Sequence, residues 1–334
     1  MSAIDVIGGG PGGAMAAIAA RGEGADVRVF EKSAFPRHKV CGEFLSPEIL
    51  GLLRRAGCAE AFLALRPAPI RHMELHFGPR VVRHPLPRAA YGLSRHALDR
   101  LLLDKAVTLG VEVVRDTRAP RTARRPLICA TGRTGQAQAG ARLFGFKTHY
   151  RGVVDDTVAL YFFDGCYVGV SAVEGGEINV CGLGPEPLLR ECAFQPERLL
   201  ARCPALQSRL QGFERAFDWL TTGPVVMGLA PQEAPEPLVY PVGDALGFID
   251  PFTGSGILNA MLSGHDAGVA AARGRPVDEY LAGARRALRR PFIVSTMFRR
   301  VLGSGWAGPV ASLVPGRWLF HWTRPVLPAQ GVDQ

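Results

Sequence analysis

The residues best suited to chemistry lie at the start of the chain, in a run of glycines with one proline, GGGPGG (8–13). The run contains the spacing G-x-G-x-x-G at Gly8, Gly10 and Gly13. Gly8 allows a tight turn, Gly10 lacks the Cβ that would block a pyrophosphate, and Gly13 lets a helix lie close to a strand. This spacing predicts the binding of a dinucleotide.

The sequence on both sides of these glycines predicts the strands and the helix that must position them. An apolar strand is predicted over residues 4–7, a helix over residues 14–21, and a second strand over residues 26–30. Phosphates would sit at the helix N-terminus, where free N–H groups and the helix dipole favour negative charge. Glu31, at the tip of the second strand, would accept hydrogen bonds from ribose hydroxyls and disfavour a 2′-phosphate. NAD and FAD both use this unit, so it leaves the choice between them open.

A second glycine-rich segment favours FAD. It follows a predicted strand over residues 237–242 and precedes a predicted apolar helix over residues 257–271. Asp244 at the strand end can bind the hydroxyls of a ribityl chain. The helix N-terminus would stabilise negative charge on a reduced flavin by roughly 1 kcal/mol. Gly254 and Gly256 let the backbone approach a flat ring.

Five segments resemble the FAD-dependent oxidoreductase superfamily that includes aromatic hydroxylases, flavin halogenases and geranylgeranyl reductases. They are GGGPGG (8–13), FPRHKVCGE (35–43), SRHALDRLL (94–102), LICATGR (127–133) and GDALGFIDPFTGSGILNAMLSG (243–264). The resemblance implies an α/β fold. A Rossmann-like FAD-binding domain of the glutathione-reductase type would be interleaved with a mostly antiparallel β-sheet substrate domain, and a C-terminal helical segment would follow.

The expected domain boundaries follow the strand patterns. We expect a discontinuous FAD-binding domain over 1–65, 91–141 and 231–275, a substrate-binding sheet over 66–90 and 142–230, and the helical segment over 276–334. Alternating or apolar strand patterns lie at 72–77, 143–150, 158–163, 166–173 and 177–183. Gly175 and Gly176 predict a hairpin turn between the last two.

The resemblance also implies which residues contact FAD. Asp244 would contact the ribityl or pyrophosphate region, Pro251 would approach the flavin edge, and Arg95 would help to hold the cofactor beside Lys39. The full expected set is Gly8, Gly10, Pro11, Gly13, Glu31, Lys32, Arg37, Cys41, Gly42, Arg95, Gly132, Gly243, Asp244, Pro251, Gly254, Ser255, Gly256 and Ile257. Candidates for the substrate wall are Lys147, His149, Tyr161 and Tyr167. Catalytic residues are not assigned, and the candidates for that role are Cys41, Pro251 and Lys147.

Two chemistries remain open for such a flavoenzyme. The first is a tailoring monooxygenase that hydroxylates a hydrophobic small molecule of secondary metabolism; the alternative is a geranylgeranyl-reductase-like ene-reductase or dehydrogenase. GDALG (243–247) departs from the GDAAH of aromatic hydroxylases, the W-x-W-x-I-P signature of halogenases is absent, and so is the Y-x-W-x-F-P element of geranylgeranyl reductases. Because only one dinucleotide fingerprint is present, NADPH or NADH would bind transiently, or a separate electron donor would supply electrons.

A second alternative is a membrane-associated electron-transfer flavoprotein. Trp306, Trp318, Phe320 and Trp322 would then form an interfacial foot. The apolar stretch 301–322 contains Pro309, Pro315 and Arg317, so we expect membrane contact at most and no spanning helix.

Composition and charge limit the partners, metal sites and cellular locations that we expect for this chain. The net charge is +9, and the densest basic cluster lies at 115–125. The aromatic residues that stack on bases are missing there, so nucleic acid is not an expected partner. Seven cysteines with no C-x-x-C pair predict neither a disulfide framework nor a zinc site, and no metal constellation is visible. With no signal peptide pattern, a reducing cytoplasm is the expected location.

Overall fold

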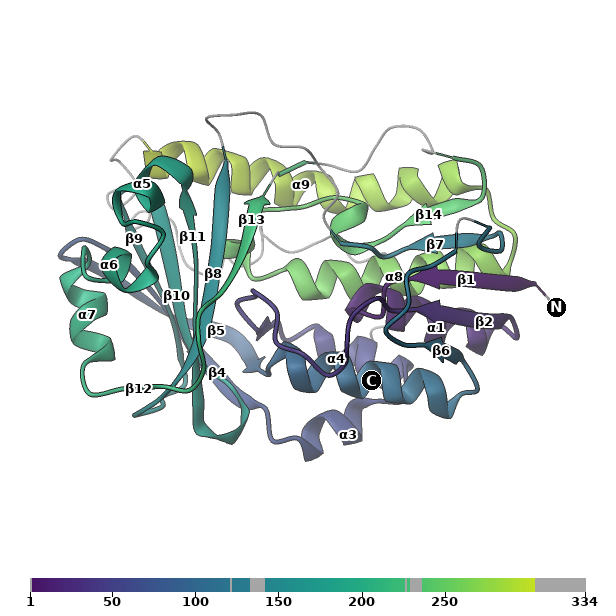
Figure 1. Cartoon of the computed structure of the whole chain (residues 1–334), viewed down its shortest axis with the longest axis horizontal. Coiled ribbons are helices and arrows are strands. Elements are labelled where there is room, and N and C mark those ends of the chain that lie inside the picture. The colour runs from purple at the N-terminus through teal and green to yellow at the C-terminus, as the bar shows by residue number, and fades with distance from the viewer. Residues whose placement is uncertain (1, 121, 133–141, 226, 229–235, 304–334) are drawn as a thin grey trace.

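A computed structural model describes residues 2–120, 122–132, 142–225, 227–228 and 236–303. Figure 1 shows two parts: a parallel sheet packed against helices on the right and a large, mostly antiparallel sheet on the left. The long helix α9 (Val277–Gly303) runs along the top and reaches from one part to the other.

The parallel sheet has five strands in the order β14-β7-β1-β2-β6. Its centre, β1 (Ala3–Ile7), pairs in parallel with β2 (Asp26–Phe30) and β7 (Leu127–Cys129). The outer strands are β6 (Glu112–Val114) and β14 (Val239–Pro241). The strand, helix and strand predicted around the N-terminal glycines are therefore present, and the α/β, Rossmann-like fold class is confirmed.

Two helices from distant parts of the chain pack on each other beside this sheet. These are α1 (Pro11–Gly22) and α8 (Gly256–Ala272). A Cβ on Gly264 of α8 would lie only 2.1 Å from the carbonyl oxygen of Gly12 in α1. The two backbones thus touch at a point that only glycine allows.

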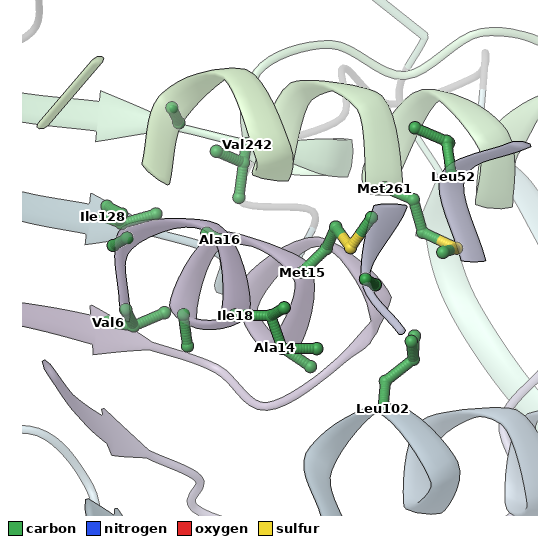
Figure 2. Packing of buried hydrophobic residues seen from close by; sticks show 14 of the residues in the cluster. Val6, Ala14, Met15, Ala16, Ile18, Leu52, Leu102, Ile128, Val242 and Met261 are labelled. Atoms are coloured by element: carbon green, nitrogen blue, oxygen red, sulfur yellow. The ribbon is translucent and has the colours of Figure 1, made fainter. Parts of the chain in front are cut away.

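The core of this part is built mainly by α1 and its neighbours. In Figure 2, Met15 of α1 lies close to Met261 of α8, Ala16 lies farther along α1, and Leu102 approaches from α4 (Arg95–Thr108). All four side chains are fully buried. Burial of apolar area at roughly 25 cal/mol per Å² makes this cluster a main source of stability for the part of the fold that carries the glycines.

The large sheet runs in the order β12-β8-β11-β10-β9-β4-β5-β3, and β13 pairs with β8. All of its pairs are antiparallel except one, the parallel pair of β4 (Ala68–Phe77) and β9 (Thr157–Phe163). The other strands are β3 (Phe44–Leu45), β5 (Arg80–Gly92), β8 (Leu143–Arg151), β10 (Cys166–Ala172), β11 (Glu177–Pro185), β12 (Glu214–Arg215) and β13 (Leu220–Val225). Gly175 and Gly176 have φ of 71° and 76° in the turn that joins β10 to β11, as the sequence predicts.

One face of the large sheet is covered by short helices. These are α5 (Glu186–Glu191), α6 (Pro196–Leu200) and α7 (Pro204–Leu210), and their leucines pack with Phe146 and Tyr161. The expectation that Tyr161 faces the substrate is therefore wrong, because its register places it on the covered face.

The first part of the chain also contains α2 (Ile49–Arg55) and α3 (Ala59–Ala64).

The predicted C-terminal segment is represented by α9, while the aromatic residues proposed as an interfacial foot lie outside the described residues. Among the helices that are described, none combines the length and the apolar character needed to cross a membrane.

Candidate active site

The N-terminus of α1 forms an anion-binding corner. No side chain caps it, since the N-cap residue is Gly10. A Cβ on Gly10 would lie 3.5 Å from Arg95 Nη2 and 3.7 Å from Lys39 Nζ, so two cationic groups stand directly beside this glycine. Free N–H groups, the helix dipole and two positive charges all favour a bound phosphate.

The charges of Arg95 and Lys39 differ in how strongly they depend on pH. Burial lowers the pKa of Lys39 to about 8, and the Arg95 charge beside it acts in the same direction. Burial also works against the Arg95 charge, but Asp99 outweighs it and keeps the pKa of the guanidinium above its usual value. Arg95 donates to both Asp99 oxygens, at 2.6 and 2.7 Å. Arg95 is thus a permanent charge, whereas the charge of Lys39 depends on pH.

Glu31 is fixed at the tip of β2 and turned toward the glycine run. Its Oε2 accepts a hydrogen bond from the backbone N–H of Gly9 at 2.8 Å, and its Oε1 accepts one from Ser33 at 2.9 Å. A buried carboxylate oxygen has more than one lone pair, so further acceptor capacity remains for a hydroxyl.

The second glycine-rich segment meets β3 at Gly254. Gly254 has φ of 65°, and a Cβ there would lie 2.8 Å from the Phe44 ring. The buried carboxylate of Asp250 accepts a hydrogen bond from Arg299 of α9. Burial raises the pKa of Asp250, opposed by Arg299. This pair fastens α9 to the segment that begins α8.

A partly open cavity lies between this segment and the large sheet. Its walls are mostly apolar and aromatic. Of the few polar groups among its walls, Tyr167 and Cys181 are kept neutral because burial raises the pKa of each. The lining residues are Gly42, Phe44, Met73, Leu75, Leu86, Val158, Leu160, Phe162, Tyr167, Gly169, Ser171, Cys181, Pro251, Phe252, Thr253, Gly254 and Phe298. Its mostly apolar lining with a few polar groups is typical of a small-molecule site.

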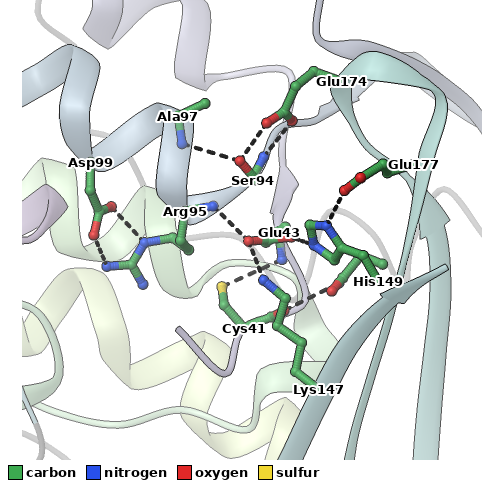
Figure 3. Close-up of polar contacts among 11 residues, drawn as sticks. Cys41, Glu43, Ser94, Arg95, Ala97, Asp99, Lys147, His149, Glu174 and Glu177 are labelled. Atoms are coloured by element: carbon green, nitrogen blue, oxygen red, sulfur yellow. Dashed lines mark hydrogen bonds and ion pairs between the residues drawn. The ribbon is translucent and has the colours of Figure 1, made fainter. Parts of the chain in front are cut away.

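A group of buried ionisable side chains stands next to this cavity (Figure 3). Glu43 lies between Gly42 and Phe44, which both line the cavity. Its Oε1 accepts from Lys147 Nζ at 2.5 Å and from the backbone N–H of Arg95 at 2.6 Å. Its Oε2 lies 2.7 Å from His149 Nε2.

The sheet register explains why Lys147 and His149 meet Glu43. Lys147 is the cross-strand partner of Cys181, which lines the cavity, and His149 is the partner of Asn179. Cross-strand partners project to the same face of a sheet. Lys147 and His149 therefore project from the face that bounds the cavity and are buried there.

Glu43 is held in an unusual backbone conformation. Its φ is 53°, in the left-handed region that non-glycine residues seldom adopt. Burial raises the pKa of its carboxyl, but hydrogen bonding to His149 and the charge of Lys147 together hold it below the usual value. The carboxylate is thus ionised at neutral pH and strongly fixed, a combination common at functional sites.

His38 lies beside this group and brings three possible metal ligands together, His38, Glu43 and His149. No pattern in the sequence predicts this grouping, because His149 lies 106 residues from Glu43 in the chain. The Lys147 ammonium already occupies Glu43, and a second positive charge at that carboxylate would be opposed by it. We assign no metal site there.

Comparison with known proteins places the N-terminal part in a family. Residues 1–125 match the family model of the FAD binding domain. Residues 1–125 of the chain therefore contain an FAD binding domain. The predicted superfamily is thus confirmed, and FAD is the cofactor that its binding domain takes.

One curated relative is similar over part of this flavoprotein. This relative is the menaquinone reductase of Mycolicibacterium smegmatis. The two sequences are 37% identical over 107 residues, which cover 31% of this chain and 25% of the relative. The match thus spans a quarter of that protein's length.

Solved structures show the same fold over nearly the whole flavoprotein. A triple mutant of the flavin-dependent brominase Bmp2 superposes with a TM-score of 0.78 at 20% identity, covering 95% of this chain and 94% of the other. The flavin-dependent halogenase CmlS gives 0.75 at 24% identity, covering 98% and 68%. A geranylgeranyl bacteriochlorophyll reductase-like protein from Thermoplasma acidophilum gives 0.71 at 19% identity, covering 99% and 94%.

The residues of this flavoprotein fit FAD at two separated points. The uncapped start of α1 with Arg95 and Lys39 suits the pyrophosphate. Pro251 and Gly254 line the cavity wall, where their backbone can meet a flat ring. Gly42, Pro251 and Gly254, predicted as flavin neighbours, all line one cavity although more than 200 residues separate the first from the last.

Other residues that were predicted to contact FAD lie where their position does not indicate a cofactor contact. Lys32 is exposed, and Gly132, with φ of 77°, faces open space. Cys41 is half-buried, and its Sγ accepts a hydrogen bond from the backbone N–H of Glu43 at 3.4 Å. Glu43 and Glu177 were not among the predicted site residues. Glu43 is nevertheless the last residue of FPRHKVCGE (35–43), one of the segments that carry the resemblance.

Lys39 leads to a test of the anion site in the flavoprotein. FAD affinity is expected to fall by roughly tenfold as the pH rises above about 8, because Lys39 then loses the charge that attracts the pyrophosphate. Lys39→Met should bind FAD more weakly at pH 7 and lose this part of the pH dependence. Fluorescence titration of the apoprotein measures both, with exposed Arg100→Met as the control. A wild-type profile identical to that of Lys39→Met would contradict the assignment.

Proposed function

We propose that this FAD-dependent oxidoreductase reduces a carbon–carbon double bond in a hydrophobic small molecule. The observation that carries the proposal is the pairing of an apolar cavity with a buried, proton-bearing group behind its wall. Bound FAD would supply the hydride. The cavity would bind the apolar substrate and exclude water, so the chain itself must supply the proton.

Lys147 is the residue that we propose as the proton donor. Its side chain is fully buried and projects from the same face of the sheet as Cys181, a cavity wall residue. Glu43 orients the ammonium group and balances its charge. The partial similarity to a menaquinone reductase supports a reductase acting on an apolar substrate. NADPH or NADH remains our proposal for the reductant.

Hydroxylation is the second candidate, favoured by the aromatic character of the cavity. Five of its lining residues are aromatic: Phe44, Phe162, Tyr167, Phe252 and Phe298. Such walls suit an aromatic substrate, and electron-rich aromatic rings are the acceptors in flavin-dependent hydroxylation. Here the chain would need to position the ring and exclude water, and the buried lysine would have no assigned role.

The atoms gained by the product distinguish the two reactions. The FAD-loaded protein, reduced with dithionite, is mixed with menaquinone or with an aromatic polyketide, first without oxygen and then with ¹⁸O₂. Reduction of a carbon–carbon double bond predicts an oxygen-independent product that still carries two additional hydrogen atoms after any quinol has been reoxidised to the quinone. Hydroxylation predicts a product only with oxygen, carrying one ¹⁸O atom. Mass spectrometry reads both, with the apoprotein as control. If neither probe is converted, both proposals fail for these substrate classes.

A further inference from the structure

Within the described part of the chain, Glu177 connects the buried group beside the cavity to solvent. Glu177, at the start of β11, is 31% exposed through its side chain, whereas His149 is 1% exposed and Glu43 and Lys147 are fully buried. Glu177 Oε2 lies 2.8 Å from His149 Nδ1, and His149 Nε2 lies 2.7 Å from Glu43 Oε2. An unbroken line of hydrogen bonds therefore runs from the surface to Lys147.

We propose that Glu177, His149 and Glu43 form a proton relay that recharges Lys147 from solvent. The inference rests on the proposed function in one respect only, the role of Lys147 as the donor. A donor that is sealed from water must be reprotonated before each further turnover. Histidine is suited to the middle position because its two ring nitrogens can receive a proton on one side and release one on the other.

The transfer balances at each atom. When Lys147 has given a proton to the substrate, its nitrogen holds a free electron pair. His149 passes its Nε2 proton to Glu43 Oε2 while its Nδ1 takes a proton from the Glu177 carboxyl group. Rotation of the Glu43 carboxyl group presents the new proton to Nζ, where the N–H bond forms. Glu177 takes its replacement from water, and His149 is left as its Nδ1–H tautomer. The starting tautomer returns only when the Nδ1 proton is lost and Nε2 is protonated again.

The electrostatics of Glu43 favour this sequence. Burial raises the proton affinity of its carboxyl, and the charge of Lys147 is one of the main influences that lower it. Once Lys147 is neutral, that influence is removed while the burial remains. Glu43 thus becomes a better proton acceptor at the stage at which the relay needs one.

The surrounding groups do not provide a competing route. His38 stacks on His96 and meets His149 edge-on, with ring centroids 5.0 and 5.2 Å apart. Burial and the charge of Lys147 lower the pKa of His38 to about 4, so it is neutral at physiological pH. Arg151, whose Nε is 3.9 Å from Glu177, is the cation that faces the outer end. Arg95 binds Asp99, and only its backbone N–H reaches Glu43.

Proton exchange in the cofactor-free protein tests the relay without turnover. NMR would measure how fast the imidazole N–H protons of His149 and the ammonium protons of Lys147 exchange with water. Glu177→Gln keeps the size of the side chain but cannot carry a proton in this way, so it should slow both rates by about tenfold or more. Glu186→Gln replaces another partly buried carboxylate, at the start of α5, and should leave them unchanged.

Three results would overturn the relay. The first is side-chain proton exchange in Glu177→Gln at the wild-type rate, and the second is equally slow exchange in Glu186→Gln. The third is exchange of the β8 backbone amides as fast as that of the side chains, which would mean that the strand opens. If Glu177→Gln perturbs the spectrum widely, Glu177→Ala with added formate replaces it. Formate should then restore fast exchange, and its failure to do so would also refute the relay. Because neither FAD nor substrate is present, these outcomes are independent of the product test above.

Discussion

Replacing Glu43 by Gln is expected to lower the free energy of unfolding by about 3–5 kcal/mol, the usual loss when one member of a buried ion pair is removed. Gln keeps the shape of the side chain but leaves the fully buried Lys147 ammonium without a counter-charge. Urea unfolding followed by circular dichroism measures the loss at constant m-value. A loss of less than 1 kcal/mol would contradict the buried pair.

A second change separates charge imbalance from damaged packing. Glu43→Gln combined with Lys147→Met removes both charges, so it should recover most of the stability lost in the single variant. The matched control is Arg202→Gln, which removes the half-exposed partner of Asp164 and should cost about 0–1 kcal/mol. A double variant as unstable as the single one would show that Glu43 acts through shape and not through charge.

The same pair predicts a dependence on pH. The folded pKa of Glu43 lies below its ordinary value of 4.5. Its stabilising contribution is therefore complete above that value and is lost as the pH falls through the lower, folded pKa. This part of the acid dependence of stability should be missing from Glu43→Gln.

The second large effect is expected at the contact between α1 and α8. A methyl group on Gly264 would lie 2.1 Å from the carbonyl oxygen of Gly12, and backbone atoms cannot rotate away. Gly264→Ala should therefore force the helices apart and cost about 1–3 kcal/mol or more. Because α1 carries the phosphate-binding corner at its N-terminus, FAD affinity should fall as well.

Gly283→Ala is the matched control for this substitution. Gly283 also lies within a helix, α9, but a Cβ there would meet open space. The change should be neutral or stabilise by up to about 1 kcal/mol, since Ala has the higher helix propensity. Thermal unfolding and FAD titration of both variants provide the measurement. Equal effects of the two substitutions would contradict the close contact at Gly264.

Much of the parallel half of the fold could be predicted because its signals are local. The Gly8 to Gly13 spacing, the flanking apolar runs and the acid at residue 31 lie within one short stretch, so turn chemistry and periodicity suffice. The N-cap of α4 is likewise local, because the side chain of Ser94 accepts a hydrogen bond from the Ala97 N–H at 3.1 Å.

The buried relay could not be predicted because it depends on register. Glu43 comes from a loop, Lys147 and His149 from β8, and Glu177 from β11, so 134 positions separate the first from the last. Alternation shows that residues 147 and 149 share a face, but not which face is buried or which loop covers it. The parallel pairing of β4 with β9 escaped prediction for the same reason.

The packing of α1 against α8 also affects how the chain is made. About 240 residues separate the end of α1 at Gly22 from Gly264, so at ordinary rates of synthesis α1 waits on the order of ten seconds to a minute for its partner to leave the ribosome. During that time the alanine-rich surface of α1 is available to chaperones. The first 125 residues, although they carry the phosphate-binding turn, depend on a late-emerging helix to complete their core.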